Sequence, residues 1–310
     1  YYPYSSLASQ IIGFTGVDNT GLYGLESYYN STLTGVDGRI ISAKSNSNKA
    51  QDIEYQSIYD AEPGSSLVLT IDEPIQRYLE DSLQDCYDTS GCESCYGIVM
   101  DVETGGILAM STKSDFDLND PYTVTSAKTL EELSEITDEE EYSKEYKEAM
   151  YSQWNNNAIT DTYEPGSVFK VITMAAGLEE NVVKYDEKFY CSGYIDILDT
   201  HYFCHNHSGH GSQTLTQGLM NSCNPYFITI GQRLGVETFY KYFEAFGFTE
   251  KTGIDLPNEA TPVKGVTYHA QETMSKVNLA SCSFGQSFEV SAIQMLTAIN
   301  SIANGGKLMK

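Results

Sequence analysis

Positive charge and long apolar runs are both scarce in this sequence. The 310 residues include 18 Lys and Arg against 43 Asp and Glu, which gives a formal net charge of −25. An acidic surface repels phosphate backbones and anionic lipid headgroups, and this argues against nucleic acid and anionic lipid as partners. Part of the acidic excess lies between Glu131 and Glu148, where we expect a solvated helical insertion.

No apolar stretch approaches the roughly 20 residues that a membrane-spanning helix needs. The longest apolar run, Val171 to Leu178, is short and is expected in a protein core. The sequence starts with Tyr1 instead of Met, and its last residues follow directly on an apolar helix pattern. We therefore expect the chain to be part of a longer protein at both ends, with any export signal or anchor before Tyr1.

The sequence does have enough apolar material for a globular protein, with 41% hydrophobic and 12% aromatic residues. Residues 1–65 are rich in Gly, Ser, Tyr and Asn, and we expect one short helix there, near Leu22 to Leu33. We interpret residues 1–65 as the remnant of a larger N-terminal module. Turn residues at 63–66 mark a boundary, so residues 66–310 are predicted to form the second domain.

The second domain is expected to mix helices with antiparallel strands. Leu67 to Ile71 is predicted to be a buried strand, and Asp72 to cap a helix that runs to about Leu83. Two apolar runs, 96–102 and 106–110, flank a short Gly-containing turn and predict a hairpin. Further helices are expected over residues 130–150, 167–179, 215–221, 225–234, 236–246 and 290–303. This order predicts an α+β fold rather than a doubly wound one.

Two short motifs carry candidate chemistry. Ser167 and Lys170 form the chain's only Ser-x-x-Lys, at the start of an apolar helix pattern, where unpaired backbone N–H groups favour negative charge. Their spacing puts both side chains on one helical face, and burial of the lysine would make it a usable base. Ser222 and Asn224 form the only Ser-x-Asn, in a break between two helices. Each motif also has a purely structural alternative. Ser167 could be only a helix N-cap, and residues 222–224 could form an ordinary capping turn before Pro225.

The two motifs together resemble the signature of penicillin-binding proteins and serine β-lactamases. The series Cys-Ser-Gly, Phe-Cys, Gly-His-Gly and Asn-Ser-Cys-Asn, between 191 and 224, looks closest to the Gram-positive, sporulation-type members. The resemblance extends to longer segments that look like class B transpeptidases. These segments are Gly-Leu-Tyr-Gly-Leu-Glu-Ser-Tyr-Tyr at 21–29, Val-Met-Asp-Val-Glu-Thr-Gly-Gly-Ile-Leu-Ala-Met at 99–110, Tyr-Glu-Pro-Gly-Ser-Val-Phe-Lys at 163–170 and Ser-Phe-Gly-Gln at 283–286. It implies a transpeptidase domain of helices packed on an antiparallel sheet, here incomplete, after the end of a pedestal module.

The resemblance also implies a reaction. Ser167 would attack the penultimate D-Ala of a peptidoglycan stem peptide, and Lys170 would take the serine proton. Ser222 would return a proton to the leaving amine, and Asn224 would bind the substrate amide. Other implied partners are β-lactams and a glycosyltransferase, at the outer face of the cell membrane; no cofactor or metal is assigned. The alternatives are a D,D-carboxypeptidase or β-lactamase-type hydrolase, and a non-catalytic cell-wall scaffold.

The motif Lys251-Thr252-Gly253 is interpreted as a decoy. The catalytic version of Lys-Thr-Gly in this family lies on a strand beside the serine, whereas here it follows a helix pattern and leads to Pro257, which argues against a paired strand. We expect the catalytic copy to lie beyond Lys310 and residues 1–310 alone to show weak or no transpeptidation.

Seven cysteines are present, an odd number that cannot all pair within one chain. Cys191 and Cys204 with three histidines could build a zinc site, but their spacing is irregular. A disulfide between Cys204 and Cys223 would restrain the Ser222–Asn224 turn and make acylation redox-sensitive; unconnected thiols are the alternative.

Overall fold

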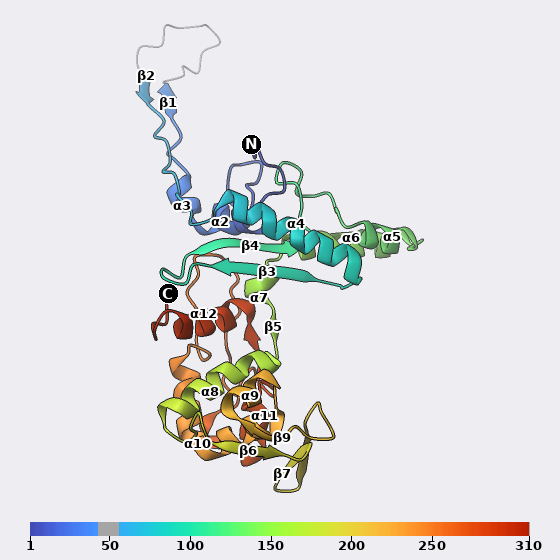
Figure 1. Cartoon of the computed structure of the whole chain (residues 1–310). Helices are drawn as coiled ribbons and strands as arrows, with labels where there is room; N and C mark the ends of the chain where they lie inside the picture. The colour runs from blue at the N-terminus through green and yellow to red at the C-terminus, as the bar shows by residue number, and fades with distance from the viewer. Residues whose placement is uncertain (43–55, 310) are drawn as a thin grey trace, which may run out of the picture. The chain divides into compact units, whose positions relative to one another are not determined.

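The computed structural model describes residues 1–42 and 56–309, which form two compact units. Helices and pairs of short strands alternate along both, as Figure 1 shows, so the predicted α+β class is confirmed. In the described residues every sheet has two strands. None of the described helices is long and apolar enough to cross a membrane.

The first unit combines residues 1–95, 111–155 and 255–257. Phe14, Phe116, Leu118 and Trp154 form its buried cluster, so that the N-terminal segment packs against the segment after residue 111. Its elements are α1 (Ser9–Ile12), α2 (Gly24–Tyr28), α3 (Asn30–Leu33), β1 (Arg39–Ser42), β2 (Gln56–Tyr59), α4 (Glu73–Ser90), α5 (Ala127–Ser134) and α6 (Glu139–Trp154). The single helix expected near residues 22–33 is therefore two short helices, α2 and α3.

Helix α4 begins as predicted, but the strand expected before it is absent. The Asp72 side chain accepts a hydrogen bond from the backbone N–H of Ile75, and the helix continues to Ser90. Residues 67–71 are assigned to no strand, and Val68 is 98% exposed. The prediction of a buried strand there was wrong, because an apolar run is buried only where a neighbouring element covers it.

The acidic stretch also differs from the prediction, because it forms two helices instead of one. Asp138 accepts hydrogen bonds from the backbone N–H groups of Glu140 and Glu141, and this cap starts α6 after a break that follows α5. Three glutamates in the first turn of α6 favour the same start through the helix dipole. The exposed surface of this stretch agrees with the expected solvated insertion.

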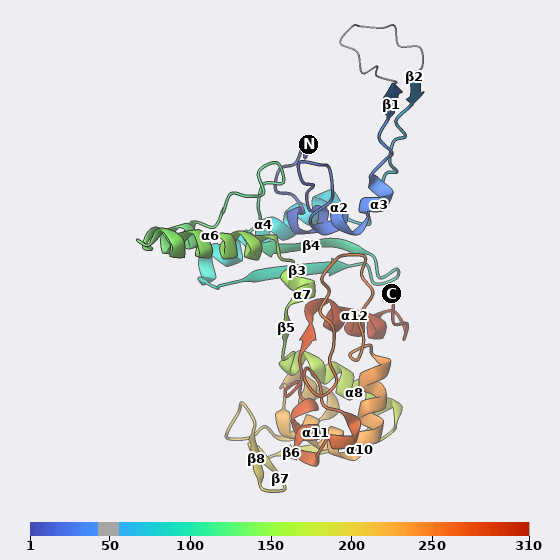
Figure 2. The same ribbon diagram turned by 180° about the vertical axis from the view of Figure 1, so that it is seen from behind.

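The second unit combines residues 96–110, 156–254 and 258–310. It contains most of the predicted hairpin, in which β3 (Cys95–Met100) pairs with β4 (Ile107–Lys113). Its other strands are β5 (Thr162–Tyr163), β6 (Lys188–Cys191), β7 (Tyr194–Ile197), β8 (Thr200–Phe203), β9 (Gly211–Thr214) and β10 (Val290–Ser291). The β7–β8 hairpin lies within the β6–β9 pair in sequence and projects from the helices in both views (Figures 1 and 2).

The helices predicted for this unit are present as the 3-10 turn η1 (Gly166–Phe169) with α8 (Lys170–Glu179), α9 (Leu215–Met220), α10 (Asn224–Ala245) and α12 (Ala292–Ala303). Two further helices, α7 (Asn157–Thr160) and α11 (Lys276–Cys282), were not predicted. Gly235, with φ of 74°, divides α10 into the two helices predicted from the sequence. Val290, expected to begin the last helix, lies in β10.

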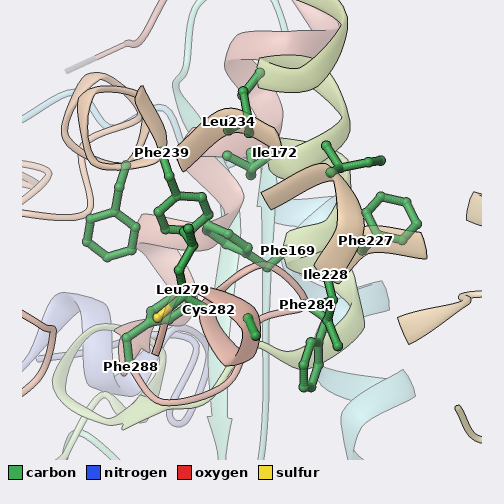
Figure 3. Packing of buried hydrophobic residues seen from close by; sticks show 14 of the residues in the cluster. Phe169, Ile172, Phe227, Ile228, Leu234, Phe239, Leu279, Cys282, Phe284 and Phe288 are labelled. Carbon is green, nitrogen blue, oxygen red and sulfur yellow. The ribbon is translucent and has the colours of Figure 1, made fainter. Parts of the chain in front are cut away.

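Phe169 is the aromatic centre of the core of this unit. Its ring lies 4.8 Å from Phe288 and 5.4 Å from Phe248, measured between centroids. Figure 3 shows it among side chains from several helices, including Ile172 and Phe239. Because Phe169 lies between Ser167 and Lys170 in sequence, burial of this ring fixes the backbone that carries both candidate residues.

Candidate active site

Ser167 lies in the 3-10 turn η1, and Lys170 is the first residue of α8. Gly166 starts this turn with a φ of 59°, a left-handed conformation that favours glycine. In a 3-10 helix, residues three apart are eclipsed along the axis, so the turn stacks the two side chains more directly than an α-helix does. Ser167 is exposed, whereas Lys170 is fully buried.

The Lys170 ammonium nitrogen is at the centre of the site. Its Nζ lies 3.1 Å from Ser167 Oγ, 2.9 Å from Ser222 Oγ, 2.9 Å from the Ser222 carbonyl and 2.7 Å from Asn224 Oδ1. Ser222 Oγ in turn lies 2.9 Å from Ser167 Oγ. The structure therefore brings the other three sequence-predicted residues within hydrogen-bonding distance of the Lys170 nitrogen.

Burial lowers the pKa of Lys170 to about 8, although the nearby Cys223 and Cys204 oppose the shift. A neutral amine has two N–H donors and one lone pair. Ser222 O and Asn224 Oδ1 are acceptors only and satisfy both donors, which leaves the lone pair for a hydroxyl proton. This arrangement lets Lys170 accept the proton of Ser167.

The turn between α9 and α10 presents Ser222 and Asn224. Ser222 has a φ of 46°, a left-handed value that is uncommon for a residue with a side chain. Its backbone N–H donates to the Leu219 carbonyl, and Asn224 Nδ2 donates to the Phe203 carbonyl of β8 at 3.2 Å. The turn is thus held by both the helix before it and the β7–β8 hairpin.

Gly285 supports the serine turn, a role that the sequence analysis did not assign. The Gly166 N–H donates to the Gly285 carbonyl at 2.8 Å, and a Cβ on Gly285 would lie 2.0 Å from the Gly166 oxygen. Glu164 accepts a hydrogen bond from the Ser287 N–H at 2.7 Å, and β5 pairs with β10 nearby. Ser-Phe-Gly-Gln at 283–286 is part of the family resemblance, but the sequence alone does not show which segment it contacts.

Lys251-Thr252-Gly253 lies in a loop, as the sequence analysis expected. The buried Glu259 carboxylate accepts hydrogen bonds from the Thr252 N–H at 2.6 Å and from the Thr252 hydroxyl at 2.7 Å. These bonds use the polar groups of Thr252 within the loop itself, which indicates a structural role for this residue.

The cysteine and histidine candidates lie next to the Ser222–Asn224 turn. The ligand atoms of Cys191, Cys204, His210 and Cys223 are all within 4.8 Å of one another, and the three cysteines carry free thiols. Cys223 is itself the residue between Ser222 and Asn224.

Residues 95–310 match the family described as Penicillin binding protein transpeptidase domain. Stage V sporulation protein D of Bacillus subtilis is 34% identical over 310 residues, which are 99% of this chain and 44% of that protein. The chain thus spans less than half the length of this curated relative.

Two solved structures resemble the chain along its length. A peptidoglycan synthetase from Bifidobacterium adolescentis has a TM-score of 0.80 and 26% identity, covering 100% of this chain and 51% of its own. Penicillin binding protein 3 from Mycobacterium tuberculosis, complexed with aztreonam, has a TM-score of 0.77 and 27% identity, covering 99% and 58%.

Proposed function

Since the chain belongs to the penicillin-binding protein transpeptidase family, we propose that it is the catalytic part of a serine-type peptidoglycan D,D-transpeptidase that cross-links stem peptides. One observation carries the proposal: Ser167 Oγ, Lys170 Nζ and Ser222 Oγ are mutually 2.9–3.1 Å apart. A nucleophile, a base and a proton relay require this spacing.

In the acylation step, Ser167 Oγ attacks the carbonyl of the penultimate D-Ala. The new bond is an ester, and the serine proton passes to Lys170 Nζ. The peptide bond to the terminal D-Ala then breaks, and Ser222 Oγ gives its proton to the leaving amine while it recovers one from Lys170. The Ser167 backbone N–H, at the start of a helical turn, is proposed to stabilise the oxyanion.

Asn224 is proposed to bind the substrate amide, because its side chain already bridges Lys170 and the Phe203 carbonyl at the edge of the β7–β8 hairpin. An amine from a neighbouring stem peptide then attacks the ester, with Lys170 and Ser222 acting in the reverse sense. A β-lactam would acylate the same serine and stay attached.

We further propose that residues 1–310 alone react slowly, because Thr252 of Lys251-Thr252-Gly253 is hydrogen-bonded within its own loop and a second Lys-Thr-Gly would have to contact the substrate carboxylate. The same proposal includes a glycosyltransferase partner and a position at the outer face of the cell membrane. It also includes a pedestal module at residues 1–65, of which 43–55 lie outside the described residues.

Prolonged incubation with fluorescent penicillin tests the reaction. We expect a slow, covalent label that Ser167→Ala abolishes, while binding of a stem peptide to the variant persists. A label that survives Ser167→Ala would contradict the proposal. Product analysis with an added amine acceptor then separates transfer from hydrolysis, because a carboxypeptidase or β-lactamase would release the acid.

A further inference from the structure

Three cysteines and one histidine from separate segments meet behind the Ser222–Asn224 turn. Cys191 ends β6, Cys204 follows β8, His210 precedes β9 and Cys223 is the residue directly before α10. The three cysteines are at most 1% exposed, and His210 is partly buried. Nothing in the proposed transpeptidation uses these side chains.

The spacing of the four ligand atoms fits a tetrahedral metal site. With Zn–S of about 2.3 Å and Zn–N of about 2.0–2.1 Å, neighbouring ligand atoms of a tetrahedron lie roughly 3.5–3.8 Å apart. Cys204 Sγ and His210 Nδ1 are 3.5 Å apart, and all four ligand atoms lie within 4.8 Å of one another. Small side-chain rotations are therefore enough to close the tetrahedron.

The backbone around the cluster is built for close approach. At Gly193 and Gly209 the neighbouring backbone leaves no room for a side chain. A Cβ on Gly193 would lie 2.1 Å from the His207 oxygen, and one on Gly209 would lie 2.3 Å from the Cys191 oxygen. The backbone N–H groups of Gly193 and His210 face the Cys191 sulfur. Such N–H groups beside a sulfur are the outer-shell contacts that stabilise thiolate ligands.

We propose that Cys191, Cys204, His210 and Cys223 bind one Zn²⁺ as a structural site. Thiolate and imidazole ligands in tetrahedral geometry select zinc over the hard cations that prefer oxygen. Four protein ligands leave no open position, so the ion has no catalytic role. Metal binding is independent of the proposed transpeptidase function.

The proposed metal site lies next to the turn that carries Ser222 and Asn224, so a bound ion would restrain this turn. Cys223 lies between Ser222, which has left-handed backbone geometry, and Asn224, the first residue of α10. A bond from its sulfur to the ion would link this turn to both strand pairs and hold Ser222 in its conformation. This positioning role, unlike the binding itself, rests on the proposed function.

Metal analysis of the reduced chain tests the proposal. Separate samples of the metal-free chain, kept anaerobic with a non-thiol reductant, are titrated with zinc chloride or with cobalt chloride. We expect one zinc ion per chain, and visible cobalt bands of tetrahedral geometry with a near-ultraviolet thiolate-to-cobalt band. Either His210→Ala or Cys191→Ser should weaken zinc binding by roughly 100-fold or more, since even outer-shell changes cost roughly 10–100-fold.

Matched controls remove a residue of the same type outside the cluster. Cys282→Ser removes another buried thiol and His207→Ala a neighbouring histidine, and both should bind zinc like the unchanged chain. Zinc should also raise the unfolding temperature of the unchanged chain. The proposal is overturned if the reduced chain binds no zinc, if His210→Ala and Cys191→Ser bind it unchanged, or if the freshly isolated chain contains no zinc and a disulfide within the cluster.

Discussion

At the scale of single residues, Lys170 has the environment that a base needs. It is fully buried, its Nζ contacts two hydroxyls and two pure acceptors, and burial lowers its pKa to about 8. The groups that face it include Cys223 and Cys204, which oppose the shift, and the ring of Phe227 at 5.7 Å. The protonated lysine cannot accept the serine proton, so the fraction of active enzyme depends on this pKa.

The first prediction concerns pH. The rate at which penicillin acylates Ser167 should rise with pH and level off above about 8, because Lys170 is neutral only above its lowered pKa. A rate–pH profile from intact-protein mass spectrometry checks this. A rate that does not change between pH 6 and pH 9, roughly two units below and one above the expected midpoint, would contradict the role of Lys170 as base.

The second prediction concerns the charge of the base. Lys170→Arg keeps a cation in place but removes a usable base, because the guanidinium stays protonated at all relevant pH values. The acylation rate should fall by roughly 100- to 10,000-fold, the usual contribution of a general base. Lys251→Arg, in the loop motif, is the matched control and should acylate like the unchanged chain. Equal rates for both variants would show that Lys170 does not act as proposed.

The sequence was most informative at this scale. Ser-x-x-Lys and Ser-x-Asn are short local patterns, and the resemblance that they carry already implied that both act in one reaction. Gly285 could not be assigned in the same way, because its function is a contact with Gly166 and depends on a fold that joins distant segments. The sequence also did not predict which cysteines and histidines come together. Their spacing along the chain is irregular, and only the fold brings their ligand atoms close to one another.

At the scale of elements, capping residues decided where the helices begin. Asp72 was identified as a cap, and α4 starts there. Asp138 has the same function for α6, but the acidic run around it hides the break between α5 and α6. The predicted strand at residues 67–71 failed for another reason, because its burial would need a partner element that local sequence does not specify.

The third prediction tests the support of the serine turn. Gly285→Ala would combine a left-handed φ of 89° with a Cβ only 2.0 Å from the Gly166 oxygen. We expect the free energy of unfolding to fall by about 3 kcal/mol or more, and acylation to slow because the turn that carries Ser167 must move.

The matched control is Gly253→Ala, where φ is 82° but nothing lies within 4 Å of the added Cβ. This change should cost roughly 1–2 kcal/mol from backbone conformation alone and leave acylation unchanged. Denaturant unfolding and penicillin labelling of both variants supply the comparison. If Gly253→Ala slowed acylation as much as Gly285→Ala, the loop motif would be part of the active site after all.

At the scale of the whole molecule, the family assignment and the α+β class followed from motifs spread along the chain, and residues 95–310 match the family. The domain boundary predicted near residue 65 remains a prediction. The two compact units divide the chain differently, because segments distant in sequence, such as residues 255–257, join the first unit. The position of a segment in the sequence does not show which distant segments it contacts in the fold.

The fourth prediction concerns chain length. A longer form of the protein that carries a further Lys-Thr-Gly should be acylated at least about tenfold faster than residues 1–310, because one charge-assisted hydrogen bond to the substrate carboxylate contributes roughly 1.5–3 kcal/mol. Side-by-side labelling time courses measure the difference. Equal rates would mean that residues 1–310 already hold every group the reaction needs.

The central claim is that Ser167 is the nucleophile, and peptide mapping of the penicillin adduct tests it most directly. After prolonged incubation, the account predicts a single acyl adduct on the peptide that contains Ser167, absent from Ser167→Ala and present in Ser283→Ala, in which another serine of the same unit is removed. An adduct on a different residue, or no adduct on the unchanged chain, would contradict the account.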